Sequence, residues 1–380
     1  MRRALADAPA DVQKGRTALI ISSTKGDVDA GTPLAESARR IGASLGLAST
    51  PIVVCNACIS GLSALVLACR LLDAGLYDYA VVCGADTPGR FITSGFQSLK
   101  ALSSEPCRPF DMERFGLNLG EAAATVVLAA SRPRVATTGG IWQLSRGCIR
   151  NDAFHISAPS KTGEGLYLAL CETLRGIDAS ELALLNAHGT ATLFNDQMES
   201  VAIERAGLSE VPMNALKGYF GHTLGAAGIL ETIICMKSVA DGIVLATRGF
   251  EELGVSGKVD ISADNRPAKG NAFVKMLSGF GGCNATILAR KDSAPANNET
   301  LVDEAEGTTP EPATMRITHR VTMNETVITI DGTPLHLESG DRKTSILTEV
   351  YRQKIGNYPK FYKMDKLSSC LLYTSPSPRD

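Results

Sequence analysis

The chain has 380 residues, of which 44% are hydrophobic and 21% charged, and its formal net charge is −2. This composition is ordinary for a globular protein and allows one large domain or two smaller ones. Because the charges nearly balance, nothing indicates nucleic acid or an anionic membrane as a general partner. The N-terminal residues lack the apolar core of a signal peptide, so a secreted protein is not expected.

From Thr17 to Asp292, apolar runs of strand length alternate with stretches of helical spacing. Strands separated by helices of crossover length predict a layered α/β fold. The expected strands are Thr17–Ser23, Pro51–Cys55, Tyr79–Cys83, Ala123–Leu128, Leu182–Ala187, Val211–Asn214, Asn271–Leu277 and Ala285–Ala289. The expected helices are Pro33–Leu45, Ile59–Ala74, Gly163–Leu174, Asn195–Ala206 and Leu224–Asp241.

The uncharged run Ile52–Cys69 has the length of a membrane span. It contains Asn56, Ser60 and Gly61, however, and it divides into a strand, a turn and a helix. We interpret it as a buried strand–helix unit of the α/β core, so no membrane span is expected.

The composition changes after the last expected strand. Residues 291–314 are acidic and rich in Pro, Thr and Ala, which predicts a linker. Residues 315–369 resume an apolar pattern, with a hairpin expected around Asp331-Gly332 and helical spacing over Thr344–Ile355. We interpret them as a small C-terminal segment, the start of a second module. Residues 370–380 resemble the translated end of a sequencing adapter and are left out of the fold prediction.

Ten cysteines are scattered along the chain, mostly in apolar runs, and they predict buried thiols in a reducing cytoplasm. Cys55 and Cys58 alone form a C-x-x-C pair, for which a redox pair is one interpretation. Cys58 also lies in N-A-C-I-S-G, between an expected strand and an expected helix. Backbone N–H groups and the helix dipole would lower the pKa of a thiol there, which makes Cys58 a candidate nucleophile. An inert buried cysteine is the alternative of equal weight.

Two of the five histidines lie in frames marked by glycine. His188, in N-A-H-G-T-A-T, follows the carboxyl end of an expected strand, where ligands bind in open α/β sheets. Thr190 and Thr192 place hydroxyls in the same loop. Asn195, at the start of the next helix, is expected to cap it.

The second histidine, His222, lies in K-G-Y-F-G-H-T-L-G-A-A-G. Lys217 opens this frame, and Glu231 lies on the helix that follows, so the two are expected to pair if the lysine is buried. The glycines of G-A-A-G predict close helix packing. A further frame, L-S-G-F-G-G-C-N-A-T, sets Phe280 among glycines, which predicts either a mobile aromatic gate or a plain turn between strands.

The order NACISG, HGTATxxND, KxxxGHTxGAAG and GFGGxN resembles the β-ketoacyl-acyl-carrier-protein synthases of the thiolase superfamily. The block R-P-F-D-x-x-R-x-G at Arg108–Gly116 supports the same placement. The Cys-His-His set is similar to the elongating subtype, as in synthase II of bacterial fatty-acid synthesis and related polyketide systems. The resemblance spans roughly residues 17–290 and implies an α/β, thiolase-like layered αβαβα fold.

The resemblance also implies a decarboxylative Claisen condensation, with substrates carried on the 4'-phosphopantetheine of acyl-carrier protein and no metal or redox cofactor. Partners would be acyl-carrier protein and a second ketosynthase-type subunit in a dimer. The implied roles are nucleophile for Cys58, decarboxylation and enolate stabilisation for His188 and His222, site electrostatics for Lys217 and Glu231, oxyanion N–H and gate for Phe280, and pantetheine contact for Thr190 and Thr192.

The sequence departs from the family pattern in several places. Arg114-Phe115-Gly116-Leu117 stands where R-D-G-F is usual, Cys283 where Thr is common, and Ala191 within H-G-T-x-T. Members of the family begin with a strand–helix–strand segment, which is not found before Thr17. We therefore expect the domain to be truncated at its N-terminus, with residues 1–16 as the last part of the incomplete N-terminal region. Two alternatives stay open: a thiolase, with Cys283 as its second cysteine, and a non-catalytic partner subunit that shapes a chain-length pocket.

Overall fold

The structure, a computed structural model, describes residues 1–292 except 7, 9–11, 13, 14, 48 and 131–140, together with three short strands after residue 320. The chain divides into two units, Met1–Glu306 and Gly307–Asp380. The first unit contains every residue of the candidate site. In the second, β13 (Val321–Met323), β14 (Ile328–Ile330) and β15 (Thr333–Pro334) form an antiparallel sheet.

The first sheet of the larger unit has the strand order β2-β1-β3-β4. Its strands are β1 (Thr17–Ser22), β2 (Ile52–Val54), β3 (Tyr79–Ala85) and β4 (Ala123–Ala129). β1 runs parallel to β2 and β3, whereas β4 runs antiparallel to β3. All six residues of β1 are buried, as expected of a central strand with both faces covered.

The second sheet has the strand order β5-β12-β11-β6-β7-β9 and is also mixed. Its strands are β5 (Trp142–Asn151), β6 (Leu182–Asn186), β7 (Pro212–Asn214), β9 (Asp260–Ile261), β11 (Ala272–Gly279) and β12 (Cys283–Lys291). β6 lies parallel to β7 and β11, and β12 is antiparallel to both of its neighbours. A separate two-stranded sheet pairs β8 (Ile243–Val244) with β10 (Arg266–Pro267).

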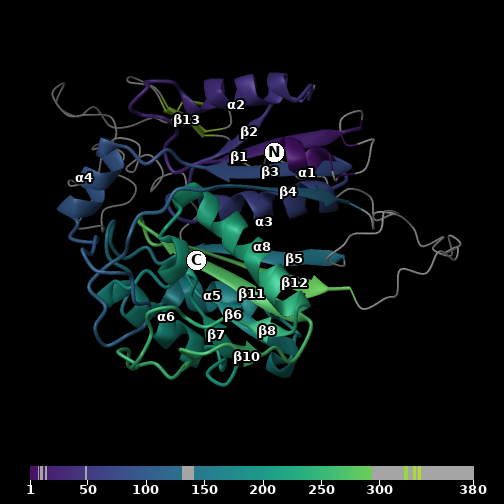
Figure 1. The fold of residues 1–380 in the computed structure, drawn as a ribbon. Helices are drawn as coiled ribbons and strands as arrows, with labels where there is room; N and C mark the ends of the chain where they lie inside the picture. Colours follow the sequence, from purple (N-terminus) through teal and green to yellow (C-terminus); the bar gives the residue numbers. More distant parts are fainter. Residues whose placement is uncertain are drawn as a thin grey trace, which may run out of the picture. The chain divides into compact units, whose positions relative to one another are not determined.

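Helices cover the sheets and separate them (Figure 1). α3 (Ser60–Asp73) and α8 (Ala227–Ala240) lie between the two sheets and contact strands of both. α2 (Leu34–Ser44) packs against the first sheet, and α5 (Glu164–Thr173) and α6 (Leu193–Arg205) cover the second. The resulting layers alternate α-β-α-β-α, which confirms the expected layered fold. The remaining helices are α1 (Arg2–Ala6), α4 (Arg90–Ser98), α7 (Lys217–Phe220) and the 3-10 turns Ala179–Glu181 and Leu224–Ala226.

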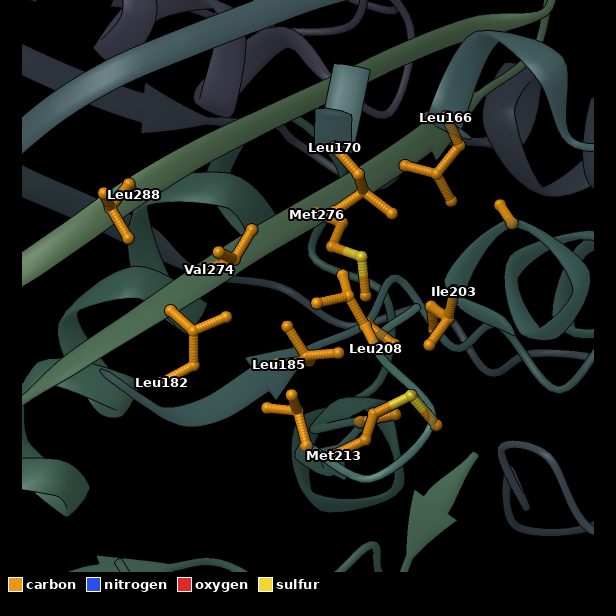
Figure 2. Packing of buried hydrophobic residues seen from close by; sticks show 14 of the residues in the cluster. Leu166, Leu170, Leu182, Leu185, Ile203, Leu208, Met213, Val274, Met276 and Leu288 are labelled. Carbon is orange, nitrogen blue, oxygen red and sulfur yellow. The ribbon is translucent and has the colours of Figure 1, made fainter. Parts of the chain in front are cut away.

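A cluster of buried side chains joins α5 and α6 to the second sheet (Figure 2). Leu170 of α5 and Ile203 of α6 belong to this cluster, together with Leu185 of β6, Val274 of β11 and Leu288 of β12. Burying each of these side chains contributes about 1.5–3 kcal/mol before the loss of conformational entropy. The cluster holds β6 and α6 in place, and those two elements carry the loop of His188.

The contact between α3 and α8 depends on glycine, as the G-A-A-G frame predicted. A Cβ atom added at Gly228 would lie 2.3 Å from the Leu62 backbone nitrogen, and one at Gly61 would lie 2.6 Å from the Gly225 oxygen. No side chain fits at either position without moving a helix. The close contact places the turn of Cys58 beside the segment that carries His222.

We therefore expect Gly228→Ala to lower the free energy of unfolding by about 1–3 kcal/mol through overpacking. Urea denaturation followed by circular dichroism would measure it. The matched control is Gly95→Ala in α4, because a Cβ atom there meets nothing within 4 Å. That variant should be neutral or slightly more stable, since Ala favours a helix over Gly by roughly 0.5–1 kcal/mol. Equal stability of the two variants would contradict the packing argument.

Most expected elements are found within two or three residues of their predicted bounds, but α4 and β5 were not predicted. α4 contains Ser, Thr and Gly, which are weak helix formers, and it buries only Ile92. In β5 the alternation is broken at Arg146, which has a φ of 48°, and at Gly147, which packs against Val66 of α3. The register between β5 and β12 shifts at the same place.

The hairpin expected around Asp331-Gly332 agrees with the pairing of β14 and β15, in which Ile330 lies opposite Thr333. The expected linker after Asp292, the helix over Thr344–Ile355 and residues 370–380 lie outside the described residues. Among the helices that the structure describes, none has the length and hydropathy needed to cross a membrane.

Candidate active site

Cys58 lies in the turn that joins β2 to α3. The preceding residue, Ala57, has a φ of 43°, a left-handed conformation that is uncommon for residues with a Cβ atom. Ser60, the first residue of α3, holds this turn: its hydroxyl donates to the Ala57 oxygen (2.6 Å) and accepts from the Asn56 N–H (2.8 Å). The turn sets Cys58, which is 6% exposed, in the wall of a cavity.

The environment of the Cys58 sulfur favours the neutral thiol. Burial raises the pKa of Cys58 to about 11, and the charge of Lys217 together with the N–H groups of Phe280 and Cys58 only partly opposes it. The expectation of a lowered pKa is therefore wrong for the free protein, because lost hydration outweighs the N–H groups. Those two N–H groups nevertheless lie at the sulfur, where an oxyanion would form on an acyl-thioester.

The loop of His188 is held by two carboxylates from the first turns of α6. The N–H groups of His188 and Gly189 donate to Glu199 Oε1 (2.7 Å) and Oε2 (2.8 Å). The Thr190 N–H donates to Asp196 Oδ1 (3.0 Å). Asp196 and Glu199 are both fully buried. These hydrogen bonds fix the backbone of the loop and therefore the position of the His188 Cα atom, from which the side chain projects.

The prediction that Asn195 caps α6 is wrong. The helix begins at Leu193, and its N-cap is Thr192, which makes no side-chain capping bond. Asn195 instead lies in the first turn, and its amide donates to Glu199 Oε2 (2.8 Å) and Asp196 Oδ1 (3.2 Å). One amide thus bridges two buried carboxylates. Sequence reasoning could not find this, because acidic residues in a first turn ordinarily indicate only the helix dipole.

The buried Glu199 predicts a pH dependence of stability. Burial and the neighbouring Asp196 raise its pKa from 4.5 to about 7. Between these two values the folded protein keeps a proton that the unfolded chain has lost, so the free energy of unfolding falls as pH rises. A shift of this size corresponds to about 3 kcal/mol.

We expect the free energy of unfolding to decrease less with rising pH in Glu199→Gln than in the wild type. Urea denaturation between about pH 5 and about pH 8 would measure this. The absolute stability of the variant will be lower, since an amide accepts at only one of its two positions, but the slope is the relevant quantity. Glu210→Gln, at an exposed position, is the matched control and should keep the wild-type slope. Parallel curves for wild type and Glu199→Gln would refute this assignment.

His222 follows α7 after Gly221, which has a φ of 75°. Its Nδ1 accepts the Leu224 N–H (3.2 Å), so the neutral ring carries its proton on Nε2. Nε2 is buried and has no hydrogen-bond partner within the part of the chain that the structure describes. It is an unused donor beside His188, with the two ring centroids 5.1 Å apart.

Lys217 and Glu231 pair as predicted, with 2.8 Å between Lys217 Nζ and Glu231 Oε1 and both side chains fully buried. Lys217 Nζ also donates to the backbone oxygen of His188 (2.6 Å). The sequence did not reveal a third member, Lys275 of β11, which pairs with Glu231 Oε2. Burial would raise the pKa of the Glu231 carboxyl, but the two lysines lower it below its usual value.

Both imidazoles are neutral in this environment. Burial lowers the pKa of His188 and of His222 well below the usual value, and the charges of Lys217 and Lys275 lower them further. A neutral imidazole keeps one N–H group, so it can donate a hydrogen bond to a developing oxyanion without first gaining a proton. The arrangement therefore suits stabilisation of negative charge near the sulfur.

A cavity of about 550 Å³ opens from these groups. Thr190 and Thr192 line it, with 2.8 Å between their hydroxyl oxygens, and so does Phe280. Much of the rest is apolar and includes Phe115 and Leu117, two of the departures from the family pattern. The other apolar lining residues include Phe96, Leu99, Met112, Leu193, Phe194 and Met198.

The loop of Phe280 turns at Gly281 and Gly282, whose φ values are 85° and 74°. It is fastened to the end of β5, because the Asn151 amide donates to the Gly281 oxygen (2.8 Å) and the Asp152 N–H to the Gly282 oxygen (2.8 Å). A gating motion of Phe280 stays a prediction.

Cys58, His188 and His222 come close enough to be considered as a metal site, since one potential ligand atom of each lies within 4.8 Å of the others. The Leu224 N–H bonded to Nδ1 of His222 argues against that use. A metal on Nε2 would need the proton on Nδ1, where it would oppose the Leu224 donor.

Comparison with known proteins agrees with this geometry. The N-terminal domain of β-ketoacyl synthases matches residues 24–133, and their C-terminal domain matches residues 144–251. The chain is 31% identical over 285 residues to nodulation protein E of Rhizobium meliloti (strain 1021), covering 73% of this chain and 71% of that protein. The chain belongs to the β-ketoacyl synthase family. It is also 34% identical over 253 residues to 3-oxoacyl-[acyl-carrier-protein] synthase 2 of the same organism, of whose length it spans 60%.

Solved structures share the fold. A ketosynthase from Xenorhabdus doucetiae, in complex with its chain length factor, superposes with a TM-score of 0.67 at 27% identity and covers 77% of each chain. A β-ketoacyl synthase from Burkholderia phymatum gives a TM-score of 0.68 at 24% identity, over 77% of this chain and 79% of that one. The fold is thus the thiolase-like α/β fold of the ketosynthases.

Proposed function

We propose that this chain is an acyltransferase that condenses an acyl group held on Cys58 with a malonyl group on acyl-carrier protein. The products are a β-ketoacyl-carrier protein and carbon dioxide. The observation that supports this best is the meeting of one thiol and two neutral imidazoles, from three separate segments, in the wall of one largely apolar cavity.

In the first step the Cys58 sulfur attacks the carbonyl carbon of an acyl thioester. The new sulfur–carbon bond forms, the carrier thiol leaves, and the proton of Cys58 ends on that thiol. The N–H groups of Cys58 and Phe280 stabilise the oxyanion that forms between these events. Because burial keeps Cys58 protonated, deprotonation accompanies attack.

In the second step a malonyl thioester enters past Thr190 and Thr192, whose hydroxyls suit the amides of its pantetheine arm. Its carbon–carboxylate bond breaks, carbon dioxide leaves, and the electron pair forms an enolate. The Nε2–H of His222 donates to the enolate oxygen beside His188. The enolate carbon then attacks the acyl-Cys58 carbonyl, the carbon–sulfur bond breaks, and the departing Cys58 thiolate takes up one proton from solvent.

Two alternatives fit the site less well. A thiolase needs a second cysteine at the reacting centre. Cys283 does not line the cavity, and its sulfur accepts a hydrogen bond from the Asn151 amide (3.3 Å). A non-catalytic partner subunit would not need Cys58 set against two imidazoles. The ketosynthase from Xenorhabdus doucetiae is in complex with a chain length factor, which supports a paired subunit for this chain too.

The test is incubation of the full chain with an acylated carrier protein and then with malonyl-carrier protein, followed by mass spectrometry. We expect an acyl adduct on Cys58, release of carbon dioxide and a β-ketoacyl product. An adduct elsewhere, or none, would overturn the proposal. Cleavage of a β-ketoacyl thioester by coenzyme A without decarboxylation would favour the thiolase alternative.

A further inference from the structure

Lys275 stands in the middle of β11, between apolar residues, and its side chain is completely buried. Its ammonium donates to the Ala187 backbone oxygen (3.1 Å) and pairs with Glu231 Oε2. Taking an ammonium out of water costs several kcal/mol unless its partners compensate. A lysine at such a position therefore calls for an explanation beyond packing.

Lys275 belongs to a buried cluster with Lys217 and Glu231. One carboxylate oxygen of Glu231 accepts a hydrogen bond from the Lys217 ammonium, and the other accepts one from the Lys275 ammonium. Two ammonium groups thus share one carboxylate, so these three buried groups together have a formal charge of +1. The same two ammonium groups bind successive backbone oxygens, those of Ala187 and His188, at the end of β6.

We propose that Lys275 is a positioning residue of the condensation site. It holds the Ala187 carbonyl at the start of the His188 loop, and it adds a second ammonium group to the buried pair of Lys217 and Glu231. The catalytic part of this inference rests on the proposed function.

The electrostatics of the histidines agree with this assignment. After burial and Lys217, Lys275 contributes to the lowered pKa of both His188 and His222. The charged or titratable groups packed around the pair come from several elements, namely Cys58, Lys217, Lys275, Glu231, Glu199 and Asp196. In such a low-dielectric region, an excess positive charge stabilises an enolate that forms beside it.

The test compares the full-length wild type with Lys275→Met, in which a side chain of similar length loses the charge. We expect malonyl decarboxylation to fall about tenfold or more, and to fall more than acylation of Cys58. We also expect the acid limb of its pH profile to move to higher pH, because the imidazoles protonate more easily without the charge. Lys258→Met, which removes an exposed lysine paired with Glu210, is the matched control.

A second variant separates charge from structure. Lys275→Met/Glu231→Gln leaves Lys217 alone and restores the formal charge of +1. The acid limb should then return toward the wild-type position, whereas a merely structural role predicts that the double variant behaves worse than the single one. If the acid limb of the double variant stays at the higher pH of Lys275→Met, the proposed effect of the charge is wrong.

Histidine titration by NMR makes the test independent of activity. The pKa of His188 and His222 should rise in Lys275→Met, with folding checked by circular dichroism. If the wild type neither forms an acyl adduct nor decarboxylates malonyl-carrier protein, the proposed function fails while this titration still decides about Lys275. If the wild type is active and Lys275→Met keeps its rate, pH profile and titration, only the inference about Lys275 fails.

Discussion

Cys58→Ser is expected to abolish the acyl-enzyme and to lower condensation by a factor on the order of a thousand or more. The replacement is nearly isosteric, so the turn held by Ser60 and the left-handed Ala57 should persist. A hydroxyl is a far weaker nucleophile than a thiol, and the neutral imidazoles beside it are no strong bases. Mass spectrometry of the variant after incubation with an acylated carrier protein would measure the loss.

The matched control is Cys55→Ser. Cys55 is exposed, does not line the cavity, and donates its thiol hydrogen to the Thr24 oxygen (2.9 Å). In the Cys55→Ser variant, the rate of acylation at Cys58 should stay within about twofold of the wild-type rate. If both serine variants lose acylation equally, Cys58 acts with Cys55 as a pair, and the redox interpretation of the C-x-x-C spacing returns.

His222→Ala is expected to lower the decarboxylation of malonyl-carrier protein by a factor on the order of 10²–10³, the usual cost of losing one oxyanion donor. The physical reason is the free Nε2–H, which the Leu224 N–H bond on Nδ1 fixes as the donor. The rate of carbon dioxide release gives the measurement. The rate of Cys58 acylation should fall much less, because backbone N–H groups stabilise the oxyanion of that step.

The control for this variant is His155→Ala, which removes an exposed imidazole bonded only to the neighbouring Ser157 among the residues described. Its decarboxylation rate should match the wild type. Should His222→Ala decarboxylate at the wild-type rate while His188→Ala does not, the donor to the enolate would be His188 alone.

The layered fold could be predicted from the sequence because it follows from local patterns, and the three candidate residues of the site were selected by the order and spacing of their motifs. Alternating apolar runs mark the strands and helices. Each of Cys58, His188 and His222 also follows a strand or a glycine turn that places it at an element end. The pairing of Lys217 with Glu231 followed from a similar argument, since a buried ammonium needs a carboxylate.

The two longest elements that were not predicted are α4 and β5. α4 buries one residue, and the alternation of β5 is broken by the left-handed Arg146 and by Gly147. β5 pairs with β12 and packs against α3, and a short sequence window contains neither of these distant segments. The prediction for Asn195 failed for a different reason. Its amide bridges two carboxylates of its own helix, Asp196 and Glu199, instead of capping that helix.

The sequence by itself determined the layered α/β fold and singled out Cys58, His188 and His222 as candidate site residues. Only the tertiary structure decided their protonation and their support, because both depend on burial and on charges far away in the chain. Burial reversed the expected pKa shift of Cys58 and keeps both histidines neutral. It also brought Lys275 to Glu231 across 44 residues, and so added a positive charge that no local motif of the chain reveals.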